Sequence, residues 1–119
     1  MATILIVDDV AGVHRDYARG LVGHTLLRAL SAKEAREQWK KHGKVIDVVV
    51  LDGYLNPSDG ESTTEKLAEE IRASGFKGPM VASSSDDGIC NRLRHCGCDH
   101  IIHKSNLPGL LALVVQTTR

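Results

Sequence analysis

The chain of 119 residues is 42% hydrophobic but only 3% aromatic, so it is long enough for one domain whose core must be aliphatic. Its 15 Lys and Arg residues balance 15 Asp and Glu residues, which argues against a nucleic-acid-binding domain. No apolar run approaches the roughly 20 residues of a membrane span, and the start of the chain lacks the basic region of a signal peptide. Three cysteines, at positions 90, 96 and 98, do not make a disulfide framework. We therefore expect a cytoplasmic protein without nucleic-acid or membrane partners.

Apolar runs with the composition of β-strands alternate along the chain with segments of helical periodicity. The strand-like runs cover residues 3–7, 24–29, 45–51, 80–83 and 100–103. Apolar positions at helical spacing mark five helices, at Val10, Val13, Tyr17 and Leu21, near Ala35 and Trp39, at Thr64, Leu67 and Ile71, at Ile89, Leu93 and Cys96, and over 107–115. Ser31 and Glu34 are expected to form a capping box at the start of the second helix, and Trp39 to pack on the side of the first helix.

This alternation predicts an α/β fold of five strand–helix units, in which a doubly wound parallel sheet has helices on both faces. The runs 3–7 and 45–51 are the most continuously apolar, as expected for central strands. The second run carries His24 and Arg28 and is expected at an edge of the sheet. These features fit a single domain with the flavodoxin-like strand order 2-1-3-4-5.

In such a sheet, ligands bind beyond the carboxyl ends of the strands. The side chains expected there are Asp8 and Asp9 after the first strand, Asp52 at the third, Ser84 after the fourth and Lys104 after the fifth. Three neighbouring carboxylates repel one another, and Mg²⁺, which prefers oxygen ligands, would relieve that repulsion. A hydroxyl and an ammonium group beside the metal would bind the remaining oxygens of a phosphoryl group. The pattern therefore indicates phosphoryl transfer with a carboxylate as the nucleophile.

Over nearly its whole length the sequence resembles the receiver domain of two-component response regulators. The stretches that carry the resemblance are ILIVDD at 4–9, DVVVLDGYLNPSDG at 47–60, GPMVASSS at 78–85 and GCDHIIHKS at 97–105. By this resemblance Asp52 is the phosphoacceptor, and Ser84 and Lys104 contact the phosphoryl group. The resemblance also implies a magnesium site formed by Asp8, Asp9, Asp52 and the backbone carbonyl of Tyr54.

The resemblance further implies a signalling domain, residues 1–119, that catalyses only its own phosphorylation and dephosphorylation. The phosphodonor would be a histidine kinase or a histidine phosphotransfer protein. Because no output domain follows the fifth helix in this sequence, we expect a stand-alone receiver that signals by phosphorylation-dependent partner binding, with phosphorelay as the second route. The expected partner surface is the face of the fourth and fifth strands and helices, and the expected state is a monomer or a weak dimer.

Three positions depart from the usual receiver pattern. Three consecutive serines leave two choices for the phosphoryl-binding hydroxyl, with Ser83 as the alternative to Ser84. Ile101 stands where many receivers have an aromatic residue in the fifth strand, so the output change is expected to be muted or to use another route. Ser105 follows Lys104 in place of the usual proline.

Other interpretations remain open for parts of this pattern. The main alternative is a pseudo-receiver, a protein-interaction scaffold that phosphorylation does not regulate. Asp52 could merely cap its strand, and Asp8 or Asp9 could be the N-cap of the first helix. An Asp-x-Asp phosphatase is disfavoured because Tyr54 stands where that motif has its second acid. A flavin-binding protein is disfavoured because the loop after the first strand is acidic, where a phosphate cradle needs amides and hydroxyls.

Two smaller features complete the pattern. Tyr54 and Asp86 lie two residues beyond the phosphoacceptor and the hydroxyl residue, and by the resemblance such positions tune the access of water to an acyl phosphate. The run HCGCDHIIH at 95–103 holds three His and two Cys residues. Its spacing differs from that of common zinc sites, so buried cysteines and partly exposed histidines are the simpler interpretation.

Overall fold

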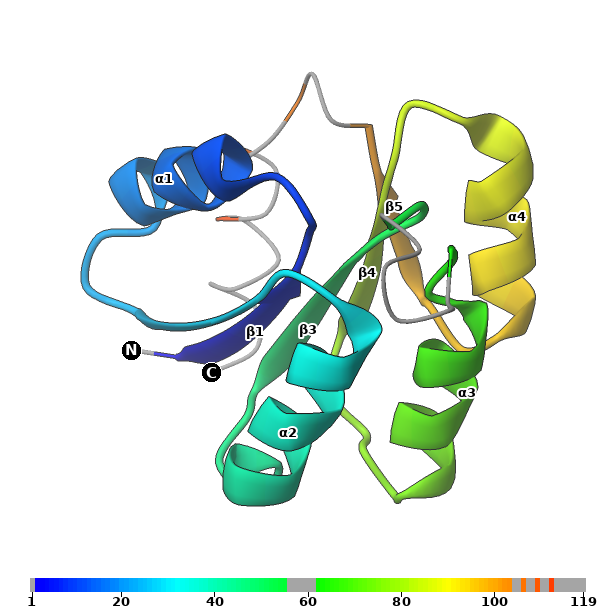
Figure 1. Cartoon of the computed structure of the whole chain (residues 1–119), viewed down its shortest axis with the longest axis horizontal. Coiled ribbons are helices and arrows are strands. Elements are labelled where there is room, and N and C mark those ends of the chain that lie inside the picture. Colours follow the sequence, from blue (N-terminus) through cyan, green and yellow to red (C-terminus); the bar gives the residue numbers. More distant parts are fainter. Residues whose placement is uncertain (1, 56–61, 104–105, 107–108, 110–111, 113–119) are drawn as a thin grey trace.

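The computed structural model describes residues 2–55, 62–103, 106, 109 and 112, which form one parallel sheet in the order β2-β1-β3-β4-β5 with helices on both faces (Figure 1). The strands are β1 Thr3–Val7, β2 Thr25–Ala29, β3 Val48–Asp52, β4 Met80–Ser83 and β5 His100–Ile102. The helices are α1 Ala11–Gly20, α2 Ala32–His42, α3 Glu65–Ala73 and α4 Asp87–His95. The predicted α/β class and strand order are confirmed.

Alternate residues of the central strands enter two separate hydrophobic cores, one on each face of the sheet. The odd-numbered residues of β1 and β3 pack against α2, α3 and α4, and these include Leu5, Val7, Val49 and Leu51. The even-numbered residues pack against α1, and these include Ile4, Ile6, Val48 and Val50. Because both faces of the sheet are covered, these strands are almost continuously apolar. Polar side chains at their carboxyl ends therefore lie at the border of the apolar core.

Side-chain caps mark the starts of α2 and α4, and a glycine marks the end of α4. The Ser31 hydroxyl accepts the backbone N–H of Glu34 at 3.1 Å and so caps α2, as expected. The reciprocal bond goes to Leu30 instead of Ser31, because the Glu34 carboxylate accepts the Leu30 N–H at 3.0 Å. Asp86 caps α4 by accepting the backbone N–H three residues further on, at 3.1 Å. Gly97 follows α4 with a φ of 116°, a conformation that favours glycine.

Strand β3, helix α1 and the packing of Trp39 differ from the sequence-based expectation. β3 begins at Val48 and not at residue 45, because Val45 is exposed in the preceding turn. Val10 is the half-exposed N-cap of α1 and not part of its buried stripe. Trp39 packs edge-on against Phe76, with ring centroids 5.3 Å apart, in the core beneath α2 and α3 and not on the α1 side.

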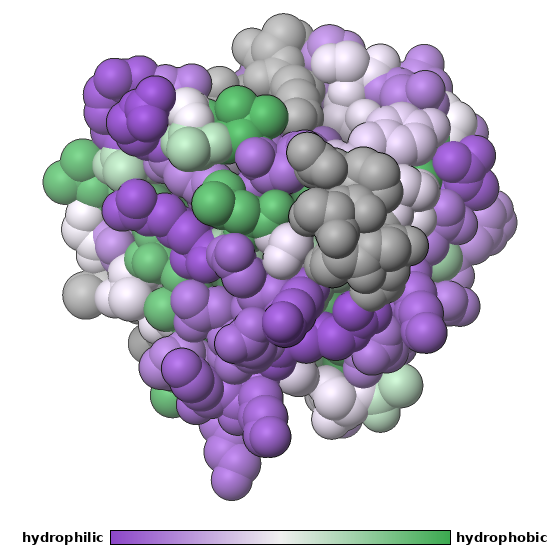
Figure 2. Space-filling view, in the orientation of Figure 1, coloured by the Kyte–Doolittle hydropathy of each residue, from purple (hydrophilic) through white to green (hydrophobic). Residues whose placement is uncertain are grey.

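The face of the molecule shown in Figure 2 is mainly polar. On the face shown in Figure 2, hydrophilic residues surround small apolar patches, and the coloured atoms form no single continuous apolar area. No helix among the described residues is long and apolar enough to cross a membrane. Of the fifth helix expected over 107–115, Ala112 packs against the core on the α1 side, and most of the rest lies outside the described residues.

Candidate functional site

Strand register brings the ends of β1, β3 and β4 side by side. Val7 of β1 pairs with Leu51 of β3, so Asp8 and Asp52, the next residues along, lie next to each other. Asp52 in turn pairs with Ser83, the last residue of β4. The alternation of side chains along each strand places Asp8, Asp52 and Ser83 on the side of the sheet that faces α1.

Asp8, Asp9 and Asp52 form a compact cluster at this edge of the sheet. One carboxylate oxygen from each residue lies within 4.8 Å of the other two. Asp8 is 2% exposed and Asp52 is 6% exposed, so both carboxylates are largely withdrawn from water. Three hard oxygen donors at this spacing fit a divalent cation such as Mg²⁺, which binds carboxylates and keeps several water ligands. The predicted convergence of these three residues is confirmed.

The backbone that follows Asp52 is held in place by hydrogen bonds within the fold. The hydroxyl of fully buried Thr64 donates to the Asp52 carbonyl at 2.8 Å. The Gly53 N–H donates to the Ser83 carbonyl at 3.2 Å, and the Gly53 carbonyl accepts the Thr64 N–H at 3.3 Å. A Cβ atom at Gly53 would lie 2.6 Å from the Ile89 side chain, so glycine allows the close approach of β3 to α4. These contacts fix the direction in which the chain leaves Asp52.

The turn after β1 fixes Asp8 in a similar way. The Asp8 carboxylate accepts the backbone N–H of Val10 at 2.9 Å, and the Asp8 carbonyl lies 2.8 Å from Nε2 of His14 in α1. Val10 occupies the N-cap position of α1, so the capping interpretation is wrong for both Asp8 and Asp9. His14 is buried, and its other ring nitrogen, Nδ1, has no hydrogen-bond partner among the described residues.

Ser83 and Ser84 end β4 in different surroundings. The hydroxyl of buried Ser84 accepts the backbone N–H of Asp86 at 3.1 Å. Ser83 is 1% exposed, and its hydroxyl has no hydrogen-bond partner within the described part of the chain. The Asp86 carboxylate is engaged in capping α4. Both serines therefore remain candidates for contact with a group bound at Asp52.

Tyr17 brings a further hydroxyl to this region from α1. Its side chain is 2% exposed in the core between α1 and the sheet. Burial raises the pKa of Tyr17 above its ordinary value; the adjacent Ser83 hydroxyl opposes this rise, and the carboxylates of Asp8 and Asp52 add to it. The Ser83 hydroxyl is close enough to influence the Tyr17 pKa, but the two groups do not meet the geometry of a hydrogen bond. A neutral phenol therefore lies beneath the acid cluster.

The remaining sequence-based candidates lie at the border of the described site or beyond it. Tyr54 is 45% exposed in the segment between β3 and α3. Hydrogen bonding with the Tyr54 hydroxyl, and after it with Glu65, raises the pKa of Arg92 in α4. Tyr54 thus lies near Arg92 of α4. Lys104, with Ser105 after it, lies outside the described residues.

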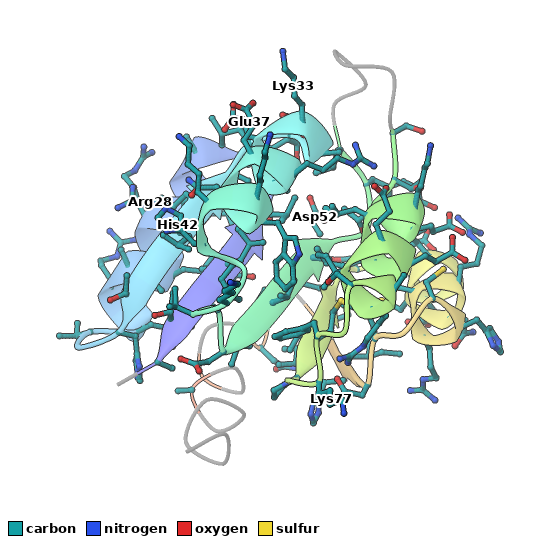
Figure 3. All side chains as sticks on the ribbon, turned by 90° about the horizontal axis from the view of Figure 1, so that it is seen from below. Arg28, Lys33, Glu37, His42, Asp52 and Lys77 are labelled. Atoms are coloured by element: carbon teal, nitrogen blue, oxygen red, sulfur yellow. The ribbon has the colours of Figure 1, made fainter. Side chains whose placement is uncertain are left out.

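A groove at the opposite end of the sheet is separate from the acid cluster. It has a volume of about 960 Å³ and is lined by residues 39–47 and 74–78. The lysines in the last turn of α2, Lys40 and Lys41, offset the partial negative charge of the helix terminus. Figure 3 labels two of the lining residues, His42 and Lys77, and shows them at a different place from Asp52.

No family model matches the sequence, and no curated protein matches it. Several solved structures match over nearly the whole chain. The chemotaxis protein CheY4 of Vibrio cholerae has a TM-score of 0.83 and 18% identity, over 100% of this chain and 99% of that chain. A two-component response regulator from Clostridium difficile has a TM-score of 0.82 and 20% identity, over 99% and 95% of the two chains. A CheY-like receiver domain protein from Methanospirillum hungatei has a TM-score of 0.81 and 17% identity, over 99% and 94%.

The chain has the receiver-domain fold. Sequence reasoning correctly brought together the three acids of this receiver fold, but it did not identify two residues of the same region. Thr64 was predicted only as a position in a helix, and its hydrogen bond to the Asp52 carbonyl depends on a turn that periodicity does not describe. Tyr17 was predicted only as part of a buried stripe. A tyrosine in a buried stripe indicates a polar group nearby, because a buried tyrosine hydroxyl usually finds a hydrogen-bond partner.

Proposed function

We propose that residues 1–119 form a receiver domain that accepts a phosphoryl group on Asp52 in a Mg²⁺-dependent reaction. The observation that carries this proposal is the convergence of three carboxylates, two of them buried, at the carboxyl edge of a receiver-fold sheet. Burying carboxylates together is costly unless cations or hydrogen bonds compensate. A strand end with a purely structural role would be served better by a neutral residue, so the cluster favours chemistry at this edge.

Asp52 supplies the nucleophile in this proposal. One of its carboxylate oxygens attacks the phosphorus of a phosphohistidine on a histidine kinase or a histidine phosphotransfer protein. The new P–O bond forms as the P–N bond breaks, and the imidazole nitrogen leaves with the electron pair and takes up a proton. The product is an acyl phosphate, which carries roughly two negative charges where the carboxylate carried one. Fixing the backbone of Asp52 through Thr64 keeps the attacking oxygen oriented.

The other proposed roles concern the charge that develops on the phosphoryl oxygens. Mg²⁺, which supplies positive charge to these oxygens, would be held by Asp8, Asp9, Asp52 and the backbone carbonyl of Tyr54. The Ser84 hydroxyl donates a hydrogen bond to one phosphoryl oxygen, and Lys104 pairs with another. The Ser84 hydroxyl accepts a backbone N–H in the structure, which leaves its own proton available for this contact.

The proposed output is cytoplasmic signalling and not turnover of other substrates. Phosphorylation changes the charge at Asp52, and this biases the surface formed by the fourth and fifth strands and helices toward binding a partner protein. Transfer of the phosphoryl group onward in a phosphorelay is the second route. The alternative function is a pseudo-receiver scaffold with the same fold, which would form no phosphoryl adduct.

The mass of the intact chain after incubation with acetyl phosphate and Mg²⁺ tests this proposal. We expect the addition of one phosphoryl group, which is lost when EDTA removes Mg²⁺ and in Asp52→Asn. Asp16→Asn, which removes an exposed carboxylate of α1, is the matched control and should be phosphorylated like the wild type. A wild-type chain that gains no phosphoryl group and does not bind beryllofluoride would support the scaffold instead.

A further inference from the structure

The α1 side of the acid cluster contains two buried hydroxyl groups that the proposed phosphoryl transfer does not use. These belong to Ser83, which is 1% exposed, and Tyr17, which is 2% exposed. Ser83 is the register partner of Asp52 on the neighbouring strand. The residues two positions before Asp52 and Ser83, Val50 and Val81, pack in the same core as Tyr17. The Tyr17 phenol and the Ser83 hydroxyl therefore lie on the buried side of Asp52, which faces α1.

The Ser83 hydroxyl is buried, and no described residue satisfies it. It has no hydrogen-bond partner among the described residues, and its Tyr17 neighbour stops short of hydrogen-bond geometry. A buried hydroxyl without a partner is unfavourable, so a native structure that keeps one needs a reason. Val81, which lies two residues earlier on the same face of β4, shows that this face accepts an apolar side chain. The Ser83 hydroxyl lies beside Asp52, which is phosphorylated in the proposed function. A hydrogen bond formed only in the phosphorylated state would explain why the hydroxyl is kept.

We propose that Tyr17 and Ser83 form a hydroxyl pair that holds the phosphorylated Asp52 side chain in position from the α1 side. In that state the Ser83 hydroxyl donates to the Asp52 oxygen that does not carry the phosphoryl group, and the Tyr17 hydroxyl donates to Ser83. Both are positioning residues, because neither touches the phosphorus. The inference rests on the proposed function, since it needs a phosphoryl group or its mimic on Asp52.

This pairing gives the Ser83 hydroxyl the partners that it lacks among the described residues. The Tyr17 phenol donates its only proton to Ser83, and the Ser83 oxygen accepts it while its own proton goes to Asp52. Two hydroxyl groups linked in this way strengthen each other, because each hydrogen bond polarises the next. The pair also connects Asp52 to α1, a helix outside the expected partner surface.

Beryllofluoride, which stands in for the phosphoryl group, allows an equilibrium test in the presence of Mg²⁺. Its affinity for the intact chain is measured by the fluorine NMR signals of the bound and free species. We expect Tyr17→Phe and Ser83→Ala each to weaken beryllofluoride binding about five- to tenfold, the equivalent of one hydrogen bond. The double variant should lose no more than Ser83→Ala alone, because the Tyr17 bond acts through Ser83. Ser85→Ala, an exposed serine of the same run, is the matched control and should bind like the wild type.

Stability and metal binding separate this role from a merely structural one. Ser83→Ala removes an unpaired hydroxyl, so the free chain should keep its wild-type stability or gain some, and Mg²⁺ affinity without beryllofluoride should stay unchanged in both variants. Variants that bind beryllofluoride as well as the wild type would overturn the inference while the proposed function stands. Variants that lose Mg²⁺ affinity and stability in parallel would also overturn it, as would independent effects in the double variant. A wild-type chain that binds no beryllofluoride would overturn the proposed function and the inference together.

Discussion

Asp52 and Ser83 are paired residues at the ends of β3 and β4, so the proposed nucleophile lies beside a buried hydroxyl that no described residue satisfies. The α1 side of the site is thus built from strand ends, and the opposite side is built from the segments that hold Tyr54 and Ser84. Side chains on regular elements are held more rigidly than those on connecting segments. We therefore expect the α1 side to define the position of Asp52 and the other side to adjust when a phosphoryl group is added.

Asp9→Asn should reduce the stabilisation that Mg²⁺ gives to the folded chain. Asp9 contributes one of three carboxylates whose oxygens lie within 4.8 Å of one another, and asparagine keeps its shape but removes its charge. In the wild type, Mg²⁺ at ten times its Kd should raise the free energy of unfolding by about 1.4 kcal/mol. The variant should gain less than half of this at the same concentration. Urea unfolding with and without Mg²⁺ measures both values, with Asp16→Asn as the control. An unchanged response in Asp9→Asn would show that Asp9 is not a ligand.

Thr64→Val should lower the free energy of unfolding by about 1–3 kcal/mol. The substitution keeps the size of the side chain but removes the buried hydroxyl that donates to the Asp52 carbonyl at 2.8 Å. The carbonyl of largely buried Asp52 then loses this hydrogen bond. Thr64→Ser keeps the hydroxyl and is the matched comparison in urea unfolding. An equal loss in Thr64→Ser would assign the effect to the packing of the methyl group and not to the hydrogen bond.

Tyr54→Ala should shorten the lifetime of the phosphorylated state several-fold. Tyr54 is 45% exposed just beyond Asp52, and in the proposed function its ring would limit the approach of water to the acyl phosphate. Tyr54→Phe keeps the ring but removes the contact between the Tyr54 hydroxyl and Arg92, so it separates shielding from that contact. The decay of the phosphorylated chain, followed by intact mass after the phosphodonor is removed, gives the rate. Identical decay in Tyr54→Ala and the wild type would show that the ring does not shield the site.

Alkaline pH should destabilise the chain through Cys98. Burial raises the pKa of this thiol to about 12, with Arg72 opposing the rise and Asp99 adding to it. In the unfolded chain the thiol ionises near its ordinary value of 9.0, so between these two values the unfolded state binds fewer protons and stability falls as pH rises. The loss should not exceed about 4 kcal/mol by the upper end of this window.

The slope of unfolding free energy against pH is measured between about pH 8 and pH 9, below the ordinary pKa of 10.0 at which tyrosines of the unfolded chain ionise. Cys98→Ala should have a smaller slope than the wild type. Cys96→Ala, at a half-buried thiol in the neighbouring turn, should keep most of the slope. A Cys98→Ala chain with the full wild-type slope would place the alkaline loss elsewhere.

The acid cluster was predictable because it depends on features that a sequence displays directly. Parallel strands that are buried on both faces read as apolar runs, and their carboxyl ends share one edge of the sheet, so Asp8, Asp9 and Asp52 had to converge. The capping role of Ser31 was predictable for the same reason, because a cap acts within a few residues of its own position.

Contacts between distant elements were not predictable from the same signals. Helical spacing identified Tyr17 as buried, but it carries no information about which groups its hydroxyl meets across the sheet. Periodicity placed Trp39 on an inner face of α2 but did not say which face of the sheet that helix covers, and the expected α1 side was wrong. Val45 continued an apolar run in the sequence, although the chain is still turning there and β3 starts three residues later.

The position of the phosphoryl group tests the central claim most directly. Reduction of the phosphorylated chain with borohydride converts an acyl phosphate of aspartate to homoserine, and the mass of the proteolytic peptides then locates that residue. The account predicts one modified position, Asp52, with Asp8 and Asp9 unchanged. A modification at any other residue, or a phosphoryl adduct that borohydride does not reduce, would contradict it.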